Sequence, residues 1–169
     1  MSDLARVASV LREQALGRRD ALADEWGESP VLPPADAGPA PLVPETAKEF
    51  VAETYAWRVE CAVARAGRVL AVRSREAWQL PGAYGRRGDA PAEIVVRAVR
   101  ERTGVDCEVT GVAYTQLLEF DCEGERLPVL RAVFRAIPVS DPEDHEPGAD
   151  WRPAASLADG DERDLLEAL

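Results

Sequence analysis

The stretch Trp78–Val105 reads WQLPGAYGRRGDAPAEIVVRAVRERTGV and decides the fold. Its second half predicts a helix over Pro91–Thr103, although the run Ile94-Val95-Val96 has the β-branched composition of a strand. Proline is favoured at the first helical position and glycine just after the last one, where Gly104 stands. The apolar side chains of such a helix share one face, which we expect to be buried against a mixed sheet (Ile94, Val95 and Val99).

The same stretch has a spacing that resembles the Nudix box. That family's pattern is Gly, five residues, Glu, seven residues, then Arg-Glu-apolar-any-Glu-Glu-any-Gly-apolar. In this chain the corresponding positions hold Ala83, Asp89, Arg97, Ala98, Glu101, Arg102 and Gly104. Leu80-Pro81-Gly82 stands where the family usually carries Leu-Pro-Gly-Gly. The resemblance implies an α/β protein with a Nudix-like α/β/α sandwich and a mixed β-sheet.

In that family the box binds magnesium against a diphosphate, and its members hydrolyse a nucleoside diphosphate linked to another moiety. Magnesium requires oxygen ligands, and residues 98, 101 and 102 would share one helical face. Of these three, only Glu101 is a carboxylate, and Arg102 adds a fixed positive charge. Two unit charges ~4 Å apart interact by about 4 kcal/mol at an effective dielectric near ~20. We therefore expect magnesium bound in the family manner to be disfavoured.

Several residues are candidates for chemistry. Glu101 is the candidate catalytic residue, and Glu101 with Glu146 from a late acidic loop are candidate metal ligands. Arginine binds phosphate bidentately without a metal. The segment Trp78–Val105 contains five arginines and only three acidic residues, although the whole chain has a net charge of −11. The candidate phosphate-binding residues are Arg86, Arg87, Arg97 and Arg102. Alternatively, these arginines and Glu146 are only solvated, or Arg97 pairs with Glu93 and Glu101 along the helix.

Composition excludes several classes of protein. The chain of 169 residues has no apolar run long enough for a membrane span and no signal pattern, so we expect a cytoplasmic protein. The net charge of −11 argues against general nucleic-acid binding. Cys61, Cys107 and Cys122 lack CxxC spacing and are expected to pack in the core. His145 is the single histidine, which excludes a His-rich metal site.

The chain divides into three segments on its patterns. Residues 1–29 predict a helical segment with a possible break at Gly17, and residues 30–54 a proline-rich connector with a short helix from Pro44. The connector either docks on the chain's own core or forms an arm exchanged in a dimer. Residues 55–169 form the Nudix-like domain. Its expected strands cover 59–63, 69–73, 107–120 and 127–137, and its last helix covers 161–169.

Three functions are compatible with these observations. The leading hypothesis is a Nudix-fold protein that binds a phosphorylated ligand of nucleoside-diphosphate type, or a partner, with weak or no hydrolysis and no required cofactor. The second is a magnesium-dependent pyrophosphohydrolase that combines Glu101 with carboxylates outside the box. The third is a structural domain that binds a partner through the proline-rich arm and the N-terminal helix, with a homodimer through the N-terminal segment as one form of this. Under the leading hypothesis Arg102 replaces the metal as partner of the anion.

Overall fold

A mixed β-sheet forms the centre of the protein. The structure, a computed structural model, describes residues 2–40 and 56–169. The sheet order is β1-β6-β7-β2-β3-β4, with β5 also paired to β2 and β8 to β3. The strands are β1 (Val31–Pro39), β2 (Trp57–Arg65), β3 (Arg68–Ser74), β4 (Ala77–Gln79), β5 (Gly82–Gly85), β6 (Cys107–Cys122), β7 (Glu125–Pro138) and β8 (Ala149–Arg152). The helices are α1 (Asp3–Trp26), α3 (Pro91–Thr103) and α4 (Gly160–Glu167), with a 3-10 turn η3 (Ala154–Ser156).

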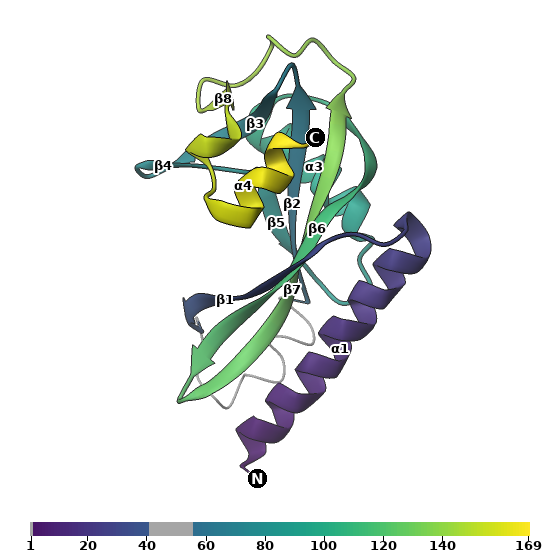
Figure 1. The fold of residues 1–169 in the computed structure, drawn as a ribbon, viewed down its shortest axis with the longest axis vertical. Helices are drawn as coiled ribbons and strands as arrows, with labels where there is room; N and C mark the ends of the chain where they lie inside the picture. The colour runs from purple at the N-terminus through teal and green to yellow at the C-terminus, as the bar shows by residue number, and fades with distance from the viewer. Residues whose placement is uncertain (1, 41–55) are drawn as a thin grey trace.

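Helices cover both faces of this sheet (Figure 1). Successive side chains of a strand point to opposite faces, so β2 contributes to two cores. Val59 packs on one face with Val95 of α3 and Leu22 of α1. Ala62 packs on the other face with Leu166 of α4. The expected α/β/α sandwich with a mixed sheet is therefore confirmed.

The helix α3 has the bounds predicted from the sequence. Pro91 occupies its first turn, and Gly104 ends it in the left-handed conformation with φ 77°, donating its N–H to the Arg100 carbonyl at 2.9 Å. Val95 and Val99 are fully buried. Ile94 is only partly buried, because it packs at the edge of this core beside Gly85.

The N-terminal helix α1 is continuous, so the predicted break at Gly17 does not occur. Gly17 is exposed, while Leu11, Ala15 and Leu22 are buried against the sheet. Tertiary packing on both sides of the glycine outweighs its poor helix propensity. Figure 1 shows α1 lying along a long ribbon formed by β6 and β7.

The part of the proline-rich connector that the structure describes docks on the chain's own sheet as the strand β1, which the sequence did not predict. It pairs in parallel with β6, and its register shifts between Leu32 and Ala35. Pro33 and Pro34 lie at this shift, and proline has no N–H to donate to a neighbouring strand, which confines it to sheet edges and irregularities. The short helix predicted from Pro44 lies outside the described residues.

The remaining predicted strands and the last helix are present. The strands β2, β3, β6 and β7 are longer than predicted, and α4 covers Gly160–Glu167 where 161–169 was predicted. Turns at Ala66-Gly67 and Glu123-Gly124 connect the hairpins, with positive φ at all four residues. Cys61, Cys107 and Cys122 are buried, as expected for packing cysteines. Within the described ranges, no helix is long and apolar enough to cross a membrane.

Candidate functional site

The positions that carry carboxylates in the Nudix box lie near the C-terminal end of α3. Glu101 and Arg102 are exposed, whereas Ala98 is buried with 4% of its surface accessible. The donor set at these positions is one carboxylate beside one guanidinium, which does not fit a magnesium ion that needs several oxygen ligands. Across residues 2–40 and 56–169, no three His, Cys, Asp or Glu side chains form a group suited to a metal.

Glu146 is brought to the same end of α3. Its backbone N–H donates to the Thr103 carbonyl at 2.8 Å. Its side chain lies against Gly104, where an added Cβ would be 3.4 Å from the Glu146 Cγ. The acidic loop is therefore fixed to the end of the helix, one turn from Glu101.

The four predicted phosphate-binding arginines do not form one cluster. Arg86, Arg87, Arg97 and Arg102 are all exposed. Arg86 and Arg87 precede α3 and Arg102 lies in its last turn, so most of a 13-residue helix separates them. At about 1.5 Å per residue this is roughly 18 Å. Among the described residues, no ion pair joins Arg97 to Glu93 or Glu101, so the alternative of a helical ion-pair ladder is not supported.

Asp89, the loop acid of the box, has a structural partner. Its Oδ2 accepts a hydrogen bond from the Arg86 backbone N–H at 2.8 Å, and its own N–H donates to the Arg86 carbonyl at 3.1 Å. These bonds close the turn that carries Arg86 and Arg87. Burial, and then the positive charge of Arg87, lower the pKa of Arg18. The N-terminal helix α1 therefore lies within electrostatic reach of the box loop.

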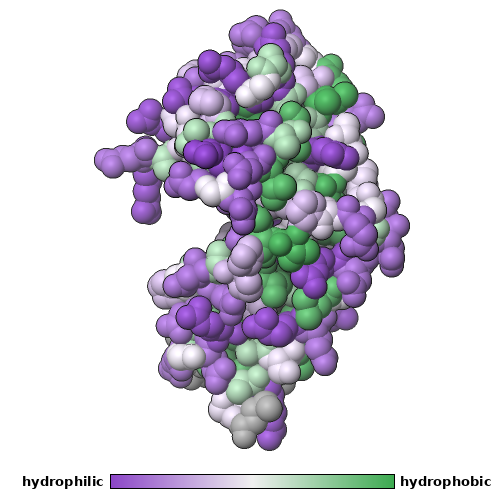
Figure 2. Space-filling view, in the orientation of Figure 1, coloured by the Kyte–Doolittle hydropathy of each residue, from purple (hydrophilic) through white to green (hydrophobic). Residues whose placement is uncertain are grey.

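A pocket of about 410 Å³ lies on the opposite face of the sheet, under α4. Arg58 and Glu60 line it, and they alternate along β2 with Val59, which faces α3. The other lining residues are Trp78, Gln79, Leu80, Tyr84, Arg131, Leu157, Glu162 and Leu166. In the view of Figure 2, the surface is hollowed below α4 and β4. The volume is within the range of small-molecule sites, about 300–1,000 Å³.

An ion-pair network forms one wall of this pocket. Arg131 on β7 donates from Nη2 to the Glu60 Oε1 at 2.8 Å and from Nε to the Glu60 Oε2 at 3.1 Å. Arg58 donates from Nε to the same Oε2 at 3.1 Å. The side chains of Arg131 and Glu60 are only 11% and 13% exposed. Because Arg58 and Arg131 are neighbours on paired strands, Glu60 bridges two adjacent cations.

The network continues into α4. The Glu162 Oε1 accepts hydrogen bonds from Arg131 Nη2 at 2.6 Å and from the Tyr114 hydroxyl at 2.7 Å. Arg131 Nη1 also donates to the Gln116 Oε1 at 2.9 Å. The helix that covers the pocket is thus joined to strands β6 and β7 through a single carboxylate.

The electrostatic environment of the network keeps Glu60 and Arg131 charged. Burial alone would raise the pKa of Glu60, but the charges and hydrogen bonds of Arg131 and Arg58 outweigh it, and the pKa is lowered. Burial would lower the pKa of Arg131, but Glu60 reverses the effect and raises it. Burial also raises the pKa of Tyr114, which therefore remains a hydroxyl that donates to Glu162. The pocket wall is a fixed arrangement of charges whose sum is zero.

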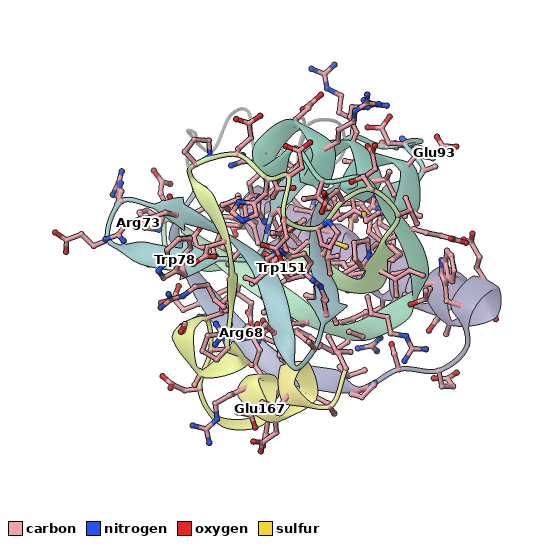
Figure 3. All side chains as sticks on the ribbon, turned by 90° about the horizontal axis from the view of Figure 1, so that it is seen from above. Arg68, Arg73, Trp78, Glu93, Trp151 and Glu167 are labelled. Carbon is pink, nitrogen blue, oxygen red and sulfur yellow. The ribbon has the colours of Figure 1, made fainter. Side chains whose placement is uncertain are left out.

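Trp78, which lines this pocket, is in contact with two more arginines that do not line it, Arg73 and Arg152. The guanidinium of Arg73 lies 5.7 Å from the centre of the Trp78 ring, and that of Arg152 lies 5.0 Å from it. Figure 3 shows Arg73 beside Trp78, on the opposite side of the molecule from Glu93 of α3. The sequence predicted neither this cluster nor the network around Arg131. The alternation of charged and apolar residues in 57–65 and 129–137 was the only sequence signal of this network. The charges come together only because β2 pairs with β7 and α4 covers that face of the sheet.

At the level of sequence, no protein-family model and no curated protein matches this chain. Solved structures do resemble its fold. An ADP-ribose pyrophosphatase from Streptococcus suis is 16% identical with a TM-score of 0.50, over 66% of this chain and 89% of that one. A NUDIX hydrolase from Nitrosomonas europaea is 15% identical with a TM-score of 0.49, over 68% of each chain. A MutT NUDIX hydrolase from Burkholderia pseudomallei is 22% identical with a TM-score of 0.46, over 66% of this chain and 95% of that one.

These identities are low, so the likenesses bear on the fold and not on the activity. The layers, the mixed sheet and the helix α3 at the predicted position agree with the spacing of residues 83–105. On these grounds the chain has the Nudix-like α/β/α fold expected from its sequence, and it shares this fold with the ADP-ribose pyrophosphatase from Streptococcus suis.

Proposed function

We propose that this protein binds a phosphorylated small molecule of nucleoside-diphosphate type, without a required metal and with weak or no hydrolysis. The observation that carries the proposal is the pocket under α4. It has the volume of a small-ligand site, aromatic side chains at Trp78 and Tyr84, and a wall of charged groups that are already oriented by hydrogen bonds. A site that is ordered before binding loses less entropy when a ligand enters.

Weak hydrolysis follows from the donor set on α3. Cleavage of a diphosphate in this fold class requires a metal that neutralises the leaving group and activates water. Ala98 offers no ligand, and Arg102 repels a cation beside Glu101. We therefore expect the protein to bind the phosphorylated ligand but to hydrolyse it slowly or not at all.

Calorimetric titration with ADP-ribose, a nucleoside diphosphate sugar, a dinucleoside polyphosphate and a nucleoside triphosphate tests the proposal. Each titration is run with magnesium and with EDTA, and product formation is followed in parallel. We expect binding of at least one of these compounds that is unchanged by EDTA. Turnover within the ordinary enzyme range of ~1–1,000 per second in magnesium would contradict the proposal.

A second candidate function is a magnesium-dependent pyrophosphohydrolase with a rearranged metal site. The observation in its favour is the position of Glu146, whose backbone is bonded to Thr103 and whose side chain lies against Gly104. In that case Glu101 and Glu146 would be metal ligands. A magnesium-dependent rise in melting temperature that disappears in both Glu101→Gln and Glu146→Gln would favour this function over the first.

A further inference from the structure

We propose that Arg73 and Arg152, both stacked on Trp78, form the phosphate-binding subsite of the pocket under α4. This inference rests on the proposed function, because it assigns a place to the ligand's phosphate. It locates that group on the sheet face opposite α3, at a distance from Glu101 and Arg102. The uncharged part of the ligand would occupy the pocket itself.

Strand register places the three side chains on the same face as the pocket. Arg73 and Trp78 are direct partners across β3 and β4, and Arg152 is the partner of Val69 across β3 and β8. Val69 and Arg73 are separated by an even number of residues on β3 and so share a face. Val69 belongs to the core under α4, together with Leu80 and Leu166, which line the pocket.

The two rim arginines differ from the two pocket arginines in their partners. Arg58 and Arg131 are neutralised by Glu60 and Glu162. Arg73 makes no ion pair with any described residue. Arg152 has a single carboxylate contact, between its Nη1 and the Asp150 Oδ2 at 3.8 Å, and its buried Nε has no hydrogen-bond partner among the described residues. A bound anion would supply the missing acceptors.

Trp78 orients the two guanidinium groups. A guanidinium over an indole face is attracted by the ring electrons, while its N–H groups point outward in its own plane. Those N–H groups remain available for the bidentate hydrogen bonds that arginine makes to phosphate oxygens. Because the tryptophan itself lines the pocket, a phosphate held by Arg73 or Arg152 would be continuous with a ligand inside it.

The charge of the pocket defines the class of ligand. Arg58, Glu60, Arg131 and Glu162 cancel, so the part of the ligand that enters should be uncharged. It should offer both donors and acceptors, since the wall presents carboxylate oxygens and guanidinium N–H groups. The expected ligand is an organic phosphate whose neutral, polar body occupies the pocket while its phosphate lies at the rim. Arg102 is the rival location for that phosphate.

Calorimetric titration of the full chain with ADP and with inorganic pyrophosphate, in EDTA, tests the inference. Arg73→Gln and Arg152→Gln should each weaken binding by about tenfold, as expected for loss of a charge-assisted hydrogen bond. Arg73→Lys keeps the charge without the planar fork and should lie between wild type and Arg73→Gln. The matched control is Arg126→Gln, which removes the same charge from an exposed site on β7. Melting curves of each variant show whether it is folded.

The outcomes separate this inference from the function on which it rests. Weaker binding in the folded Arg73 and Arg152 variants, with Arg126→Gln and Arg102→Gln unchanged, supports the rim subsite. If wild type binds, and Arg102→Gln is the variant that loses affinity while Arg73→Gln and Arg152→Gln do not, the rim subsite is wrong and the proposed function stands. If wild type binds neither compound, nor any of the nucleotides used to test the proposed function, both are overturned.

Discussion

Arg131 donates two hydrogen bonds to Glu60, one to each carboxylate oxygen, at 2.8 and 3.1 Å. The pair joins β7 to β2 in the wall of the pocket, and the bond from Arg131 to Glu162 extends it to α4. Burying two charges is costly unless their geometry is good and their other polar atoms are satisfied. Here Arg58 is a further partner of Glu60, and Gln116 and Glu162 are further partners of Arg131, so the network is a connected unit.

Arg131→Met should destabilise the protein strongly. Methionine fills a similar volume but leaves Glu60 buried with Arg58 as its remaining cation. Removing one partner of a buried pair typically costs about 3–5 kcal/mol. Urea unfolding measures the change, and Arg126→Met, at an exposed position on the same strand, is the control. A loss below ~1 kcal/mol would show that the pair is solvated and contributes little.

The contribution of Glu60 should depend on pH. Its pKa is lowered in the folded protein, so its pairing stabilises the fold fully above the ordinary carboxyl pKa of about 4.3. That stabilisation is lost as the pH falls from there through the lowered pKa. The difference in unfolding free energy between wild type and Glu60→Gln should therefore be constant near neutral pH and shrink in acid. A difference that grows in acid would mean that burial, not Arg131, controls this carboxyl.

The sequence predicted the fold largely through local signals. Pro91 and Gly104 fix the bounds of α3 because each residue suits one end of a helix. The strand β1 could not be predicted, since its prolines disfavour a strand and only contact with β6 selects one. Gly17 was misread for a similar reason, because packing outside the local sequence decides the outcome.

The candidate site was less accessible to prediction than the fold. The spacing of the box predicted a site on α3, where Glu101 and Arg102 are exposed. The pocket under α4 depends on Glu60, Arg131 and Glu162, which are distant in sequence and meet only after β2, β7 and α4 are assembled. Alternating charged residues in a strand usually indicate a solvated face. Here a C-terminal helix covers that face, and no local sequence pattern predicts that it does so.

Gly82→Ala should destabilise the protein, whereas Gly17→Ala should stabilise it. An added Cβ at Gly82 would collide with the Val59 carbonyl oxygen, so β5 would have to move away from β2. Such overpacking costs about 1–3 kcal/mol. At Gly17 nothing lies within 4 Å, and alanine in a helix interior gains about 0.5–1 kcal/mol over glycine. Thermal and urea unfolding compare the two variants, and equal effects would refute the close approach at Gly82.

Arg102→Glu should create a response to magnesium that wild type lacks. The change converts a neutral pair, Glu101 and Arg102, into two adjacent carboxylates at the end of α3, where Glu146 also lies. A dissociation constant near ~1 mM would stabilise the variant by about 1.4 kcal/mol in ~10 mM magnesium. For a protein of this size that corresponds to a rise in melting temperature of roughly 3–6 °C. Arg100→Glu makes the same change of charge on another face of the helix and should not respond. A response in wild type that Glu101→Gln removes would instead show that the existing residues already bind the ion.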